Sequence, residues 1–367
     1  MPTMDATHLR RGFLPEPDPL TAFPKGSPLA LLDEVGRELP QRLEEKGFRG
    51  YARELDIPKA PASLTLPELR LYYVRLAFLA SGYVNQVCEE PAKLLPENIA
   101  VPLVDVCRRL NRPPILSYDG YALYNWRRLD PKAPIALGNI DTFQNFVTLY
   151  DEHWFILVHV EIEAIAAGIF SAIATSVEAI KAGDTNTVDE CLRTIEDCVL
   201  RQGKVLRRIP EHMDPMLYYR TFRPYIKFFE NVVYEGVSDE PMNLRGETGA
   251  QSSIMPALIS FLKIPHKPSP LVNHLADMRN YMPAEHRALL TELAALPPVR
   301  DVASCEAFNG VLDAVADFRE VHHGWAHKYI NAHVADPRGT GGTPYMGWLT
   351  QLIDETRGWR IPETVNP

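Results

Sequence analysis

The amino-acid sequence predicts an all-α fold, because two long stretches repeat apolar residues at helical spacing. In the first, from Phe308 to Tyr329, the intervals alternate between three and four residues, so these side chains share one face of a helix. They are Phe308, Val311, Val315, Phe318, His322, Trp325 and Tyr329. The second runs from His153 to Ala182 and keeps the same spacing, over a length that is unusual for a helix of a globular protein.

The other elements are predicted from the same spacing and from the residues that start or stop helices. Further helices are expected over residues 29–51, 67–94, 96–110, 184–208, 215–229, 252–264, 271–282, 283–296, 306–334 and 345–359. Pro113 and Pro114 end the helix before them, and Asp214 followed by Pro215 is typical of a helix start. Loops are expected over residues 111–126, 131–148 and 234–249, the second with weak strand character.

The chain is expected to form two domains. Residues 1–145 would be a small, mostly helical N-terminal domain, and its proline-rich start, up to residue 30 or so, would be an irregular arm. Residues 146–367 would be a large, all-helical domain. A chain of 367 residues has the length for this arrangement.

Composition and charge exclude several classes of protein. The net charge of −9 and the short, scattered basic clusters argue against a nucleic-acid binder. Five cysteines without a C-x-x-C pair argue against a disulfide framework or a structural zinc site, and predict reduced thiols in a cytoplasmic protein. No signal peptide is recognised at the N-terminus. The most apolar run, residues 154–173, contains His159, Glu161 and Glu163, so we expect a buried helix and no membrane span.

Two histidines stand on apolar helix faces, where an imidazole needs a partner for its nitrogens. His322 lies on the stripe described above, and His159 lies beside Phe155 and Ile162. Each could be hydrogen-bonded inside a core, or could bind a metal as a neutral imidazole. Two such histidines on separate long helices suit a flat apolar cofactor between them, with one histidine as the axial ligand, which describes a haem site.

Two further features are suited to binding an amino acid. Arg223 follows aromatic residues and either extends to solvent along its stem or offers a planar guanidinium to a carboxylate. The glycine- and threonine-rich residues 339–343 precede a helix, where backbone N–H groups bind anions or zwitterions, although a plain hinge loop has the same composition. Hydrolase motifs such as G-x-S-x-G and H-E-x-x-H are absent from the sequence.

Several segments together resemble the indoleamine 2,3-dioxygenase family of haem enzymes. They are Pro113-Pro-Ile-Leu with Asn125-Trp126 and Asp130-Pro131, Tyr234-Glu-Gly, Gly249-Ala-Gln-Ser-Ser253, Met278-Arg-Asn-Tyr-Met-Pro283, Lys328-Tyr329 and Arg338-Gly-Thr-Gly-Gly-Thr343. The resemblance runs in order from about residue 95 to the last helix and is unreadable over the first ninety or so residues. It implies haem b in a large helical domain.

The resemblance also implies roles for individual residues. His322 matches the proximal iron ligand, and Arg319 matches an arginine near a haem propionate. Arg223 matches the residue that binds the substrate carboxylate. The loop threonine Thr340 matches one that contacts the amino-acid end of the substrate, and Thr248 is expected beside both substrate and cofactor. Pocket positions around the indole ring are matched by Tyr118, Tyr121, Phe155, Tyr218 and Tyr219.

Four residues depart from the family pattern. His159 stands where mammalian-type members have serine, and is similar to the distal histidine of tryptophan 2,3-dioxygenases, which bonds the indole N–H. Tyr218 and Tyr219 replace two phenylalanines. Glu247 replaces a glycine, and an acid there could pair with a substrate ammonium or disfavour a carboxylate. Asn280 replaces an acid, which would leave Arg319 freer to meet the propionate.

The function implied is oxidation of L-tryptophan by O2 to N-formylkynurenine, the first step of tryptophan catabolism through kynurenine. Arg223 and His159 would act directly on the substrate. Two alternatives stay open: a haem oxygenase that acts on another indole or aromatic amine, and a haem-binding sensor or carrier without turnover. A monomer or small homo-oligomer is expected.

Overall fold

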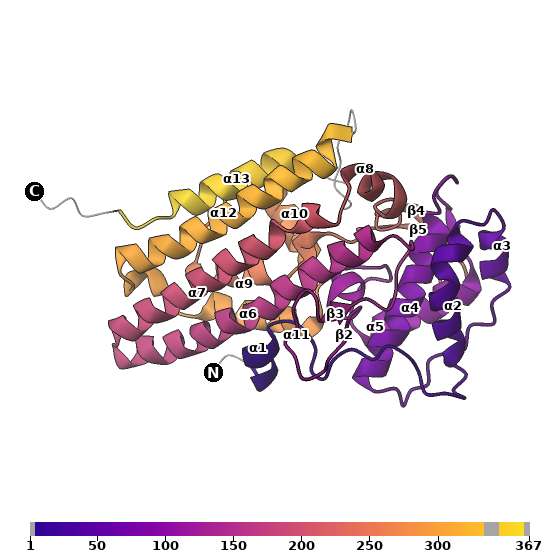
Figure 1. The fold of residues 1–367 in the computed structure, drawn as a ribbon, viewed down its shortest axis with the longest axis horizontal. Helices are drawn as coiled ribbons and strands as arrows, with labels where there is room; N and C mark the ends of the chain where they lie inside the picture. The colour runs from indigo at the N-terminus through magenta and orange to yellow at the C-terminus, as the bar shows by residue number, and fades with distance from the viewer. Residues whose placement is uncertain (1–3, 334–344, 363–367) are drawn as a thin grey trace, which may run out of the picture.

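The computed structural model describes residues 4–333 and 345–362, and it is mostly helical, which confirms the predicted class. Four long helices lie side by side along the molecule (Figure 1). They are α6 (Tyr150–Ala182), α7 (Thr185–Leu206), α12 (Cys305–Tyr329) and α13 (Tyr345–Gly358). Gly183, with φ +73°, ends α6 in the left-handed conformation that favours glycine, so α7 turns back antiparallel along α6.

A second group of helices covers the end of the molecule drawn at the right of Figure 1. It contains α2 (Ala30–Leu43), α3 (Phe48–Arg53), α4 (Leu66–Val84) and α5 (Glu97–Arg109). Helix α4 is the central one, because every residue from Leu71 to Val84 is buried. Thr65 and Glu68 form a reciprocal capping box at its start. The predicted extension of this helix to residue 94 is wrong, since α4 ends at Val84 and a loop follows.

The hydrophobic core consists of two clusters of buried residues, one mainly around α4 and one mainly around α6, α7 and α12. Helix α6 contributes to both, with Leu157 in the first cluster and Val158 in the second. The long helix is therefore shared between the two halves of the molecule. The predicted domain boundary near residue 145 stays a prediction.

The N-terminal arm contains a short helix, α1 (Ala6–Arg11), which corrects the prediction of a wholly irregular segment. Asp5 caps this helix by accepting from the backbone N–H groups of Thr7 and His8. Phe13 follows it and packs against Phe170 of α6, with ring centroids 4.8 Å apart. The arm is thus fixed on α6 by burial of an aromatic ring, although its sequence lacks a long helical period.

Two small sheets interrupt the helical architecture and correct two predictions. The first joins β1 (Leu94–Leu95), β4 (Phe229–Tyr234) and β5 (Ser238–Leu244), with β4 in the middle. The predicted loop over 234–249 was therefore wrong over residues 238–244, because β4 and β5 form an antiparallel hairpin there. The predicted helix over 215–229 is helical only to Phe222, through α8 (Pro215–Leu217) and the π-helical turn η3 (Tyr218–Phe222). Two strands of two residues, β2 (Arg127–Arg128) and β3 (Ile140–Asp141), form the second sheet.

The remaining elements connect these parts. They are the π-helical turns η1 (Asp119–Leu123) and η3 (Tyr218–Phe222), the 3₁₀ turns η2 (Ile209–Glu211), η4 (Gly249–Gln251), η5 (Val299–Asp301) and η6 (Asn331–His333), and the helices α8 (Pro215–Leu217), α9 (Ile254–Leu262), α10 (Pro270–Arg279) and α11 (Ala284–Ala295). The boundaries predicted for α5, α9, α10 and α11 agree with these within a few residues.

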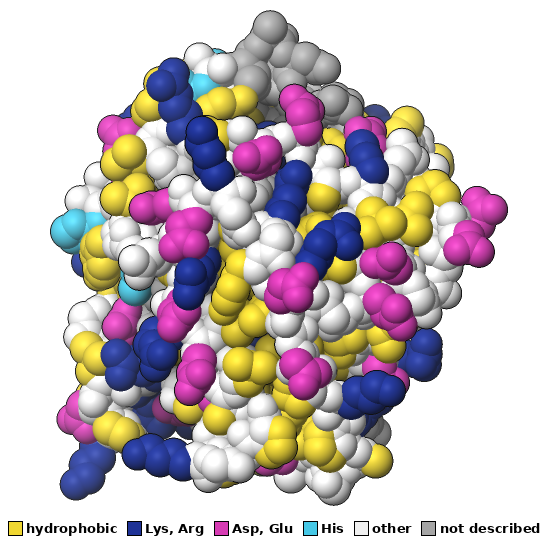
Figure 2. Space-filling view, turned by 90° about the vertical axis from the view of Figure 1, so that its right-hand side faces the viewer, with side chains coloured by type: hydrophobic (Ala, Val, Ile, Leu, Met, Phe, Trp, Pro, Cys, Tyr) yellow, Lys and Arg dark blue, Asp and Glu magenta, His cyan; other side chains and the backbone are white. Residues whose placement is uncertain are grey.

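Helix α6 is long and apolar enough to cross a membrane by length and composition, and 61% of its most apolar 18-residue window is buried inside the protein. The burial agrees with the predicted core helix. On the face formed by the N-terminal helices, basic and acidic side chains are interspersed (Figure 2). That face therefore offers no continuous basic track of the kind that follows a phosphate backbone.

Candidate functional site

One face of α6 carries a row of chemically distinctive side chains: Glu152, Phe155, His159 and Glu163. Their spacing of three, four and four residues places them on one stripe of the helix. Both glutamates are fully buried, and Phe155 and His159 lie between them, each half-buried. Burying these acids and the imidazole without hydrogen-bond partners would cost free energy, so partners are expected on the segments that pack against this stripe.

The π-helical turn η1 supplies those partners. The hydroxyl of Tyr118, the residue before the turn, donates to Glu163 Oε1 at 2.9 Å, and Tyr121 within it donates to Glu152 Oε1 at 3.1 Å. Burial raises the pKa of Glu163 to about 7 and that of Glu152 to about 8. The two tyrosine–glutamate bonds fix this turn against α6 above Phe155 and His159.

The tight geometry of η1 has a local cause. A bond of 2.8 Å from Tyr124 N–H to Asp119 O closes a wide turn of the π type, a form that is frequent at functional sites. Gly120 faces the Tyr73 ring so closely that a Cβ there would lie 2.6 Å from a ring carbon. Arg112 forms a buried ion pair with Asp119. Non-local contacts therefore set the shape of the turn.

His159 has a defined tautomer. Its Nδ1 lies 2.7 Å from the carbonyl oxygen of Phe155, which can only accept, so Nδ1 carries the proton. Burial lowers the pKa of His159 and favours the neutral ring. Nε2 then has a lone pair and can accept a hydrogen bond. The ring stands edge-on to Tyr118, with centroids 6.0 Å apart, and lies 4.6 Å from the Phe155 ring.

A second π-helical turn, η3, adds more aromatic rings to the same wall. Tyr218 is buried and its ring lies 5.6 Å from Phe155 and 5.8 Å from Tyr329 of α12. Arg223 directly follows the turn, is 4% exposed, and its guanidinium lies 5.3 Å from the centre of the half-buried Tyr219 ring. The predicted pocket residues from η1, η3 and α6 are therefore brought together.

Glu247 and Thr248 lie on the segment between β5 and η4. Glu247 is 4% exposed, and burial raises the pKa of its carboxyl to about 8. A carboxylate at Glu247 raises the pKa of both Tyr118 and Tyr121, so Glu247 lies near the same aromatic wall. The preceding Gly246 is packed so tightly that a Cβ would lie 2.3 Å from the Ile226 carbonyl oxygen. Thr248 is half-buried and caps η4 through its hydroxyl.

His322 approaches the site from α12. The His322 residue is exposed at the protein surface. Nearby protein groups lower its pKa to about 4, with desolvation as the largest cause and the basic neighbours His159, His323 and Arg319 as smaller ones. The imidazole is therefore neutral near pH 7 and has a lone pair available for a metal.

These residues fit a haem. The arrangement pairs one neutral imidazole from α12 with a second from α6, among aromatic and aliphatic side chains, as an axially ligated flat cofactor requires. Among the described residues there is no group of three or more His, Cys, Asp or Glu side chains that could hold a metal ion by themselves.

Arg319 and Thr340 were predicted near the haem propionate and the substrate, respectively. The Arg319 guanidinium donates through Nη1 to the Leu352 carbonyl at 2.7 Å and to Thr356, both on α13. Burial lowers its pKa to about 10, so it stays charged at neutral pH, and its role at a propionate stays a prediction. Thr340 and residues 339–343 lie outside the described residues.

Glu152 and Glu163 were not predicted as part of the site. A signal was present for Glu163, because it lies in the most apolar run of the chain, where an acid is rarely buried without a partner; Glu152 lies just before that run. Their partners are remote in sequence, however: Tyr118 is separated from Glu163 by 45 residues.

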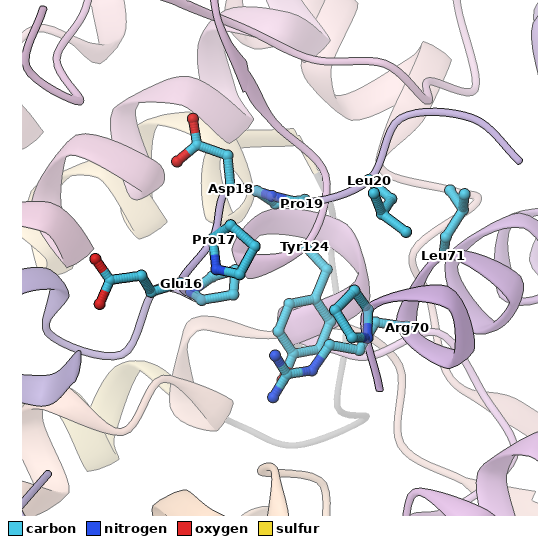
Figure 3. Close-up of a pocket in the computed structure, with 10 residues that line it drawn as sticks. Glu16, Pro17, Asp18, Pro19, Leu20, Arg70, Leu71 and Tyr124 are labelled. Carbon is cyan, nitrogen blue, oxygen red and sulfur yellow. The ribbon is translucent and has the colours of Figure 1, made fainter. Parts of the chain in front are cut away.

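Two hollows in the protein lie away from this site. One is bordered by the N-terminal arm, and there Arg70 lies across the Tyr124 ring, 4.5 Å from its centre (Figure 3). The other lies between the β4–β5 hairpin and α10, where Arg245 pairs with Asp277 at 2.9 Å. Neither contains a histidine from the site.

Comparison with known proteins gives a consistent result. The family model described as Indoleamine 2,3-dioxygenase matches residues 6–358. Indoleamine 2,3-dioxygenase 2 of Mus musculus is 30% identical over 94% of this chain and 92% of its own length. Indoleamine 2,3-dioxygenase 1 of Rattus norvegicus is 31% identical over 88% of this chain and 87% of its own length. A protein named myoglobin from Haliotis madaka is 26% identical over 88% of this chain and 90% of its own length. The similarity thus includes the first ninety or so residues, where the motifs alone gave none.

Proposed function

The chain belongs to the indoleamine 2,3-dioxygenase family, and on that premise we propose that it is a haem-dependent dioxygenase of L-tryptophan. The proposed reaction inserts both atoms of O2 across the C2–C3 bond of the indole ring, opens the ring and gives N-formylkynurenine. The observation that carries the proposal is the pair of neutral imidazoles, His322 from α12 and His159 from α6, beside an aromatic wall and a buried arginine.

His322 would hold the iron of haem b through its lone pair. The haem, when bound, supplies the activation of O2 and the redox chemistry, which no side chain of the protein provides. The contribution of the chain is to bind the substrate, to orient it and to exclude water.

The aromatic wall would bind the indole ring. Phe155 lies within ring-contact distance of two tyrosines, at 5.6 Å from Tyr218 and 6.3 Å from Tyr121 between ring centroids. Such rings bury large apolar area and prefer offset or edge-on contact with a further ring. Tyr118 and Tyr219 extend the wall at either end.

His159 would accept the indole N–H. Its Nδ1 proton is engaged by Phe155, so Nε2 is the acceptor, and the neutral ring keeps that role at neutral pH. This arrangement is similar to the distal histidine of tryptophan 2,3-dioxygenases, and it supports an indole with a free N–H as the preferred substrate.

Arg223 would bind the substrate carboxylate, and Glu247 would lie near its ammonium group. An arginine holds a carboxylate through two parallel N–H bonds and so fixes the direction of the whole molecule. Thr248 and Thr340 are proposed to assist at the amino-acid end, with Arg319 and Thr248 near the haem propionates.

The decisive experiment is aerobic turnover. Haem-loaded, reduced protein is supplied with L-tryptophan and O2, and the product is identified by mass spectrometry and by the absorbance of N-formylkynurenine. If L-tryptophan is untouched while another indole or aromatic amine is oxidised, the reaction class holds and the substrate is wrong.

A second candidate function is a haem-binding oxygen carrier or sensor without turnover. It is favoured by the similarity to the protein named myoglobin from Haliotis madaka. Arg223 argues against it, because a carrier needs no buried group for an amino-acid carboxylate. Reversible O2 binding with no consumption of saturating L-tryptophan would favour the carrier.

A further inference from the structure

Glu163 joins three walls of the site through its side chain. It belongs to α6, and its Oε1 accepts from the Tyr118 hydroxyl next to η1 at 2.9 Å and from Ser252 Oγ, after η4, at 2.7 Å. The two donors are separated from it by 45 and 89 residues. A single buried oxygen therefore holds segments that nothing in the local sequence would bring together.

The segments that Glu163 joins are also connected to each other. Gln251 of η4 accepts from the Tyr118 backbone N–H at 2.9 Å and donates to the Gly246 carbonyl at 2.9 Å. Gly246 precedes Glu247, and Ser252 follows Gln251. Movement of Tyr118 or Ser252 would therefore displace the segment that carries Glu247 and Thr248.

The surroundings of Glu163 leave little freedom to compensate for its loss. The carboxyl is fully buried, and its Oε2 has no hydrogen-bond partner within the described part of the chain. Its backbone carbonyl is covered by Gly12 of the N-terminal arm, where a Cβ would lie only 2.6 Å away. The ring of Tyr118, in turn, stands edge-on to His159 at 6.0 Å.

We propose that Glu163 is a positioning residue for substrate binding: through Tyr118 it orients the wall beside His159, and through Ser252 it fixes the segment with Glu247 and Thr248. This inference rests on the proposed function and deepens it, since it names a residue that acts on the substrate only through others. Glu152, which holds Tyr121 from the other end of the stripe, has no comparable bond to the η4 segment among the described contacts.

The test measures the affinity of haem-loaded protein for L-tryptophan from the shift of the Soret band. Glu163→Leu should weaken binding about fivefold to twenty-five-fold, because it removes two hydrogen bonds and each contributes a factor of up to roughly five. Glu163→Gln should restore most of the affinity, because its amide oxygen can accept from both hydroxyls. Glu161→Gln is the matched control on the same helix, since Glu161 accepts from Leu137 N–H outside the site; its affinity should equal that of wild type.

A double-mutant comparison separates positioning from a general loss of stability. Tyr118→Phe should weaken binding in the wild-type background and add nothing in the Glu163→Leu background, because the same bond is already lost. Equal affinity of Glu163→Leu and wild type, or an independent effect of Tyr118→Phe in both backgrounds, overturns the inference.

If Glu163→Leu does not fold, Tyr118→Phe and Ser252→Ala remain as single changes that leave Glu163 in place. Each should weaken binding, and the double variant should be weaker still; unchanged affinity in both singles overturns the inference. A wild-type protein that gives no Soret response to L-tryptophan overturns the proposed function and this inference with it, whereas a normal wild-type response with a silent Glu163→Leu overturns the inference alone.

Discussion

His159 donates its Nδ1 proton to the carbonyl oxygen of Phe155, one helical turn earlier, at 2.7 Å. This contact inside α6 leaves Nε2 as an acceptor, so the ring is prepared for a donor such as the indole N–H. The chemistry of the pocket is in this way decided by a backbone carbonyl that the side-chain pattern does not reveal.

Replacing His159 by alanine should leave the haem bound and reduce discrimination for the indole N–H. Wild-type protein should prefer L-tryptophan to 1-methyl-L-tryptophan, which lacks that N–H, and His159→Ala should lose about a factor of ten of this preference in kcat/KM, since one hydrogen bond is removed. Loss of haem in this variant, or an unchanged ratio of the two substrates, would contradict the assigned role.

Replacing His322 by alanine should give protein that purifies with little haem. The neighbouring His323→Ala is the matched control, because His323 lies about 100° further round the helix and should retain haem. The ratio of Soret absorbance to protein absorbance measures both. A full haem content in His322→Ala would show that the axial ligand lies elsewhere.

Replacing Arg223 by alanine should raise the KM for L-tryptophan at least tenfold, because a charged hydrogen-bonded pair with the carboxylate contributes about 1.5–3 kcal/mol. Steady-state kinetics with tryptamine, which has no carboxylate, should show a much smaller change. Arg220→Ala, an exposed arginine three residues earlier, should behave as wild type. Equal effects on the two substrates would argue against a carboxylate contact.

The contribution of three buried carboxyls to stability should decrease as the pH rises from about 4.5 to about 8. Burial raises the pKa of Glu163 to about 7 and those of Glu152 and Glu247 to about 8 from 4.5. An acid with a raised folded-state pKa stabilises the fold fully below 4.5, and this contribution is lost as the pH rises through the folded value. Urea unfolding should show slopes of up to about 1.4 kcal/mol per pH unit for each group, and Glu163→Gln should flatten the curve.

At lower pH the buried histidines act in the opposite sense. Burial lowers the pKa values of His159 and His286, so their neutral forms stabilise the fold above about pH 6.5 and that contribution is lost in acid. The histidine and carboxyl contributions therefore oppose each other between about pH 4.5 and 6.5, and above pH 6.5 only the loss from the carboxyls remains. A free energy of unfolding that rises steadily between pH 6.5 and 8.5 would show that the three carboxyls are ionised in the folded protein.

Replacing Gly12 by alanine should destabilise the protein by more than replacing Gly26. Both glycines have positive φ, +64° and +84°, so each substitution strains the backbone by about 1–2 kcal/mol. At Gly12 the added Cβ would also meet the Glu163 carbonyl at 2.6 Å, whereas nothing lies within 4 Å at Gly26. Equal shifts in thermal unfolding would mean that the arm moves away from α6 without cost.

Much of the helical architecture could be predicted from periodicity, because a helix is a local structure with a period of 3.6 residues. The run from His153 to Ala182 placed His159 beside Phe155. The stripe from Phe308 to Tyr329 predicted His322 rather than His323 as the inward residue; His322 is exposed and His323 half-buried, so this choice stays a prediction. The hairpin of β4 and β5 was missed, because strand pairing depends on partners outside the window in which a period is read.

What the sequence alone determined, therefore, was the helical class, the position of His159 on α6 beside Phe155 and the arginine among aromatic residues. Only the tertiary structure decided the π-helical turns at Tyr121 and Tyr218, the tautomer of His159 and the use of Glu152 and Glu163 as acceptors. The physical reason is the range of the interactions. Periodicity and capping act within one or two turns of a helix, whereas a buried carboxyl is stable only with donors that the fold brings to it from distant segments.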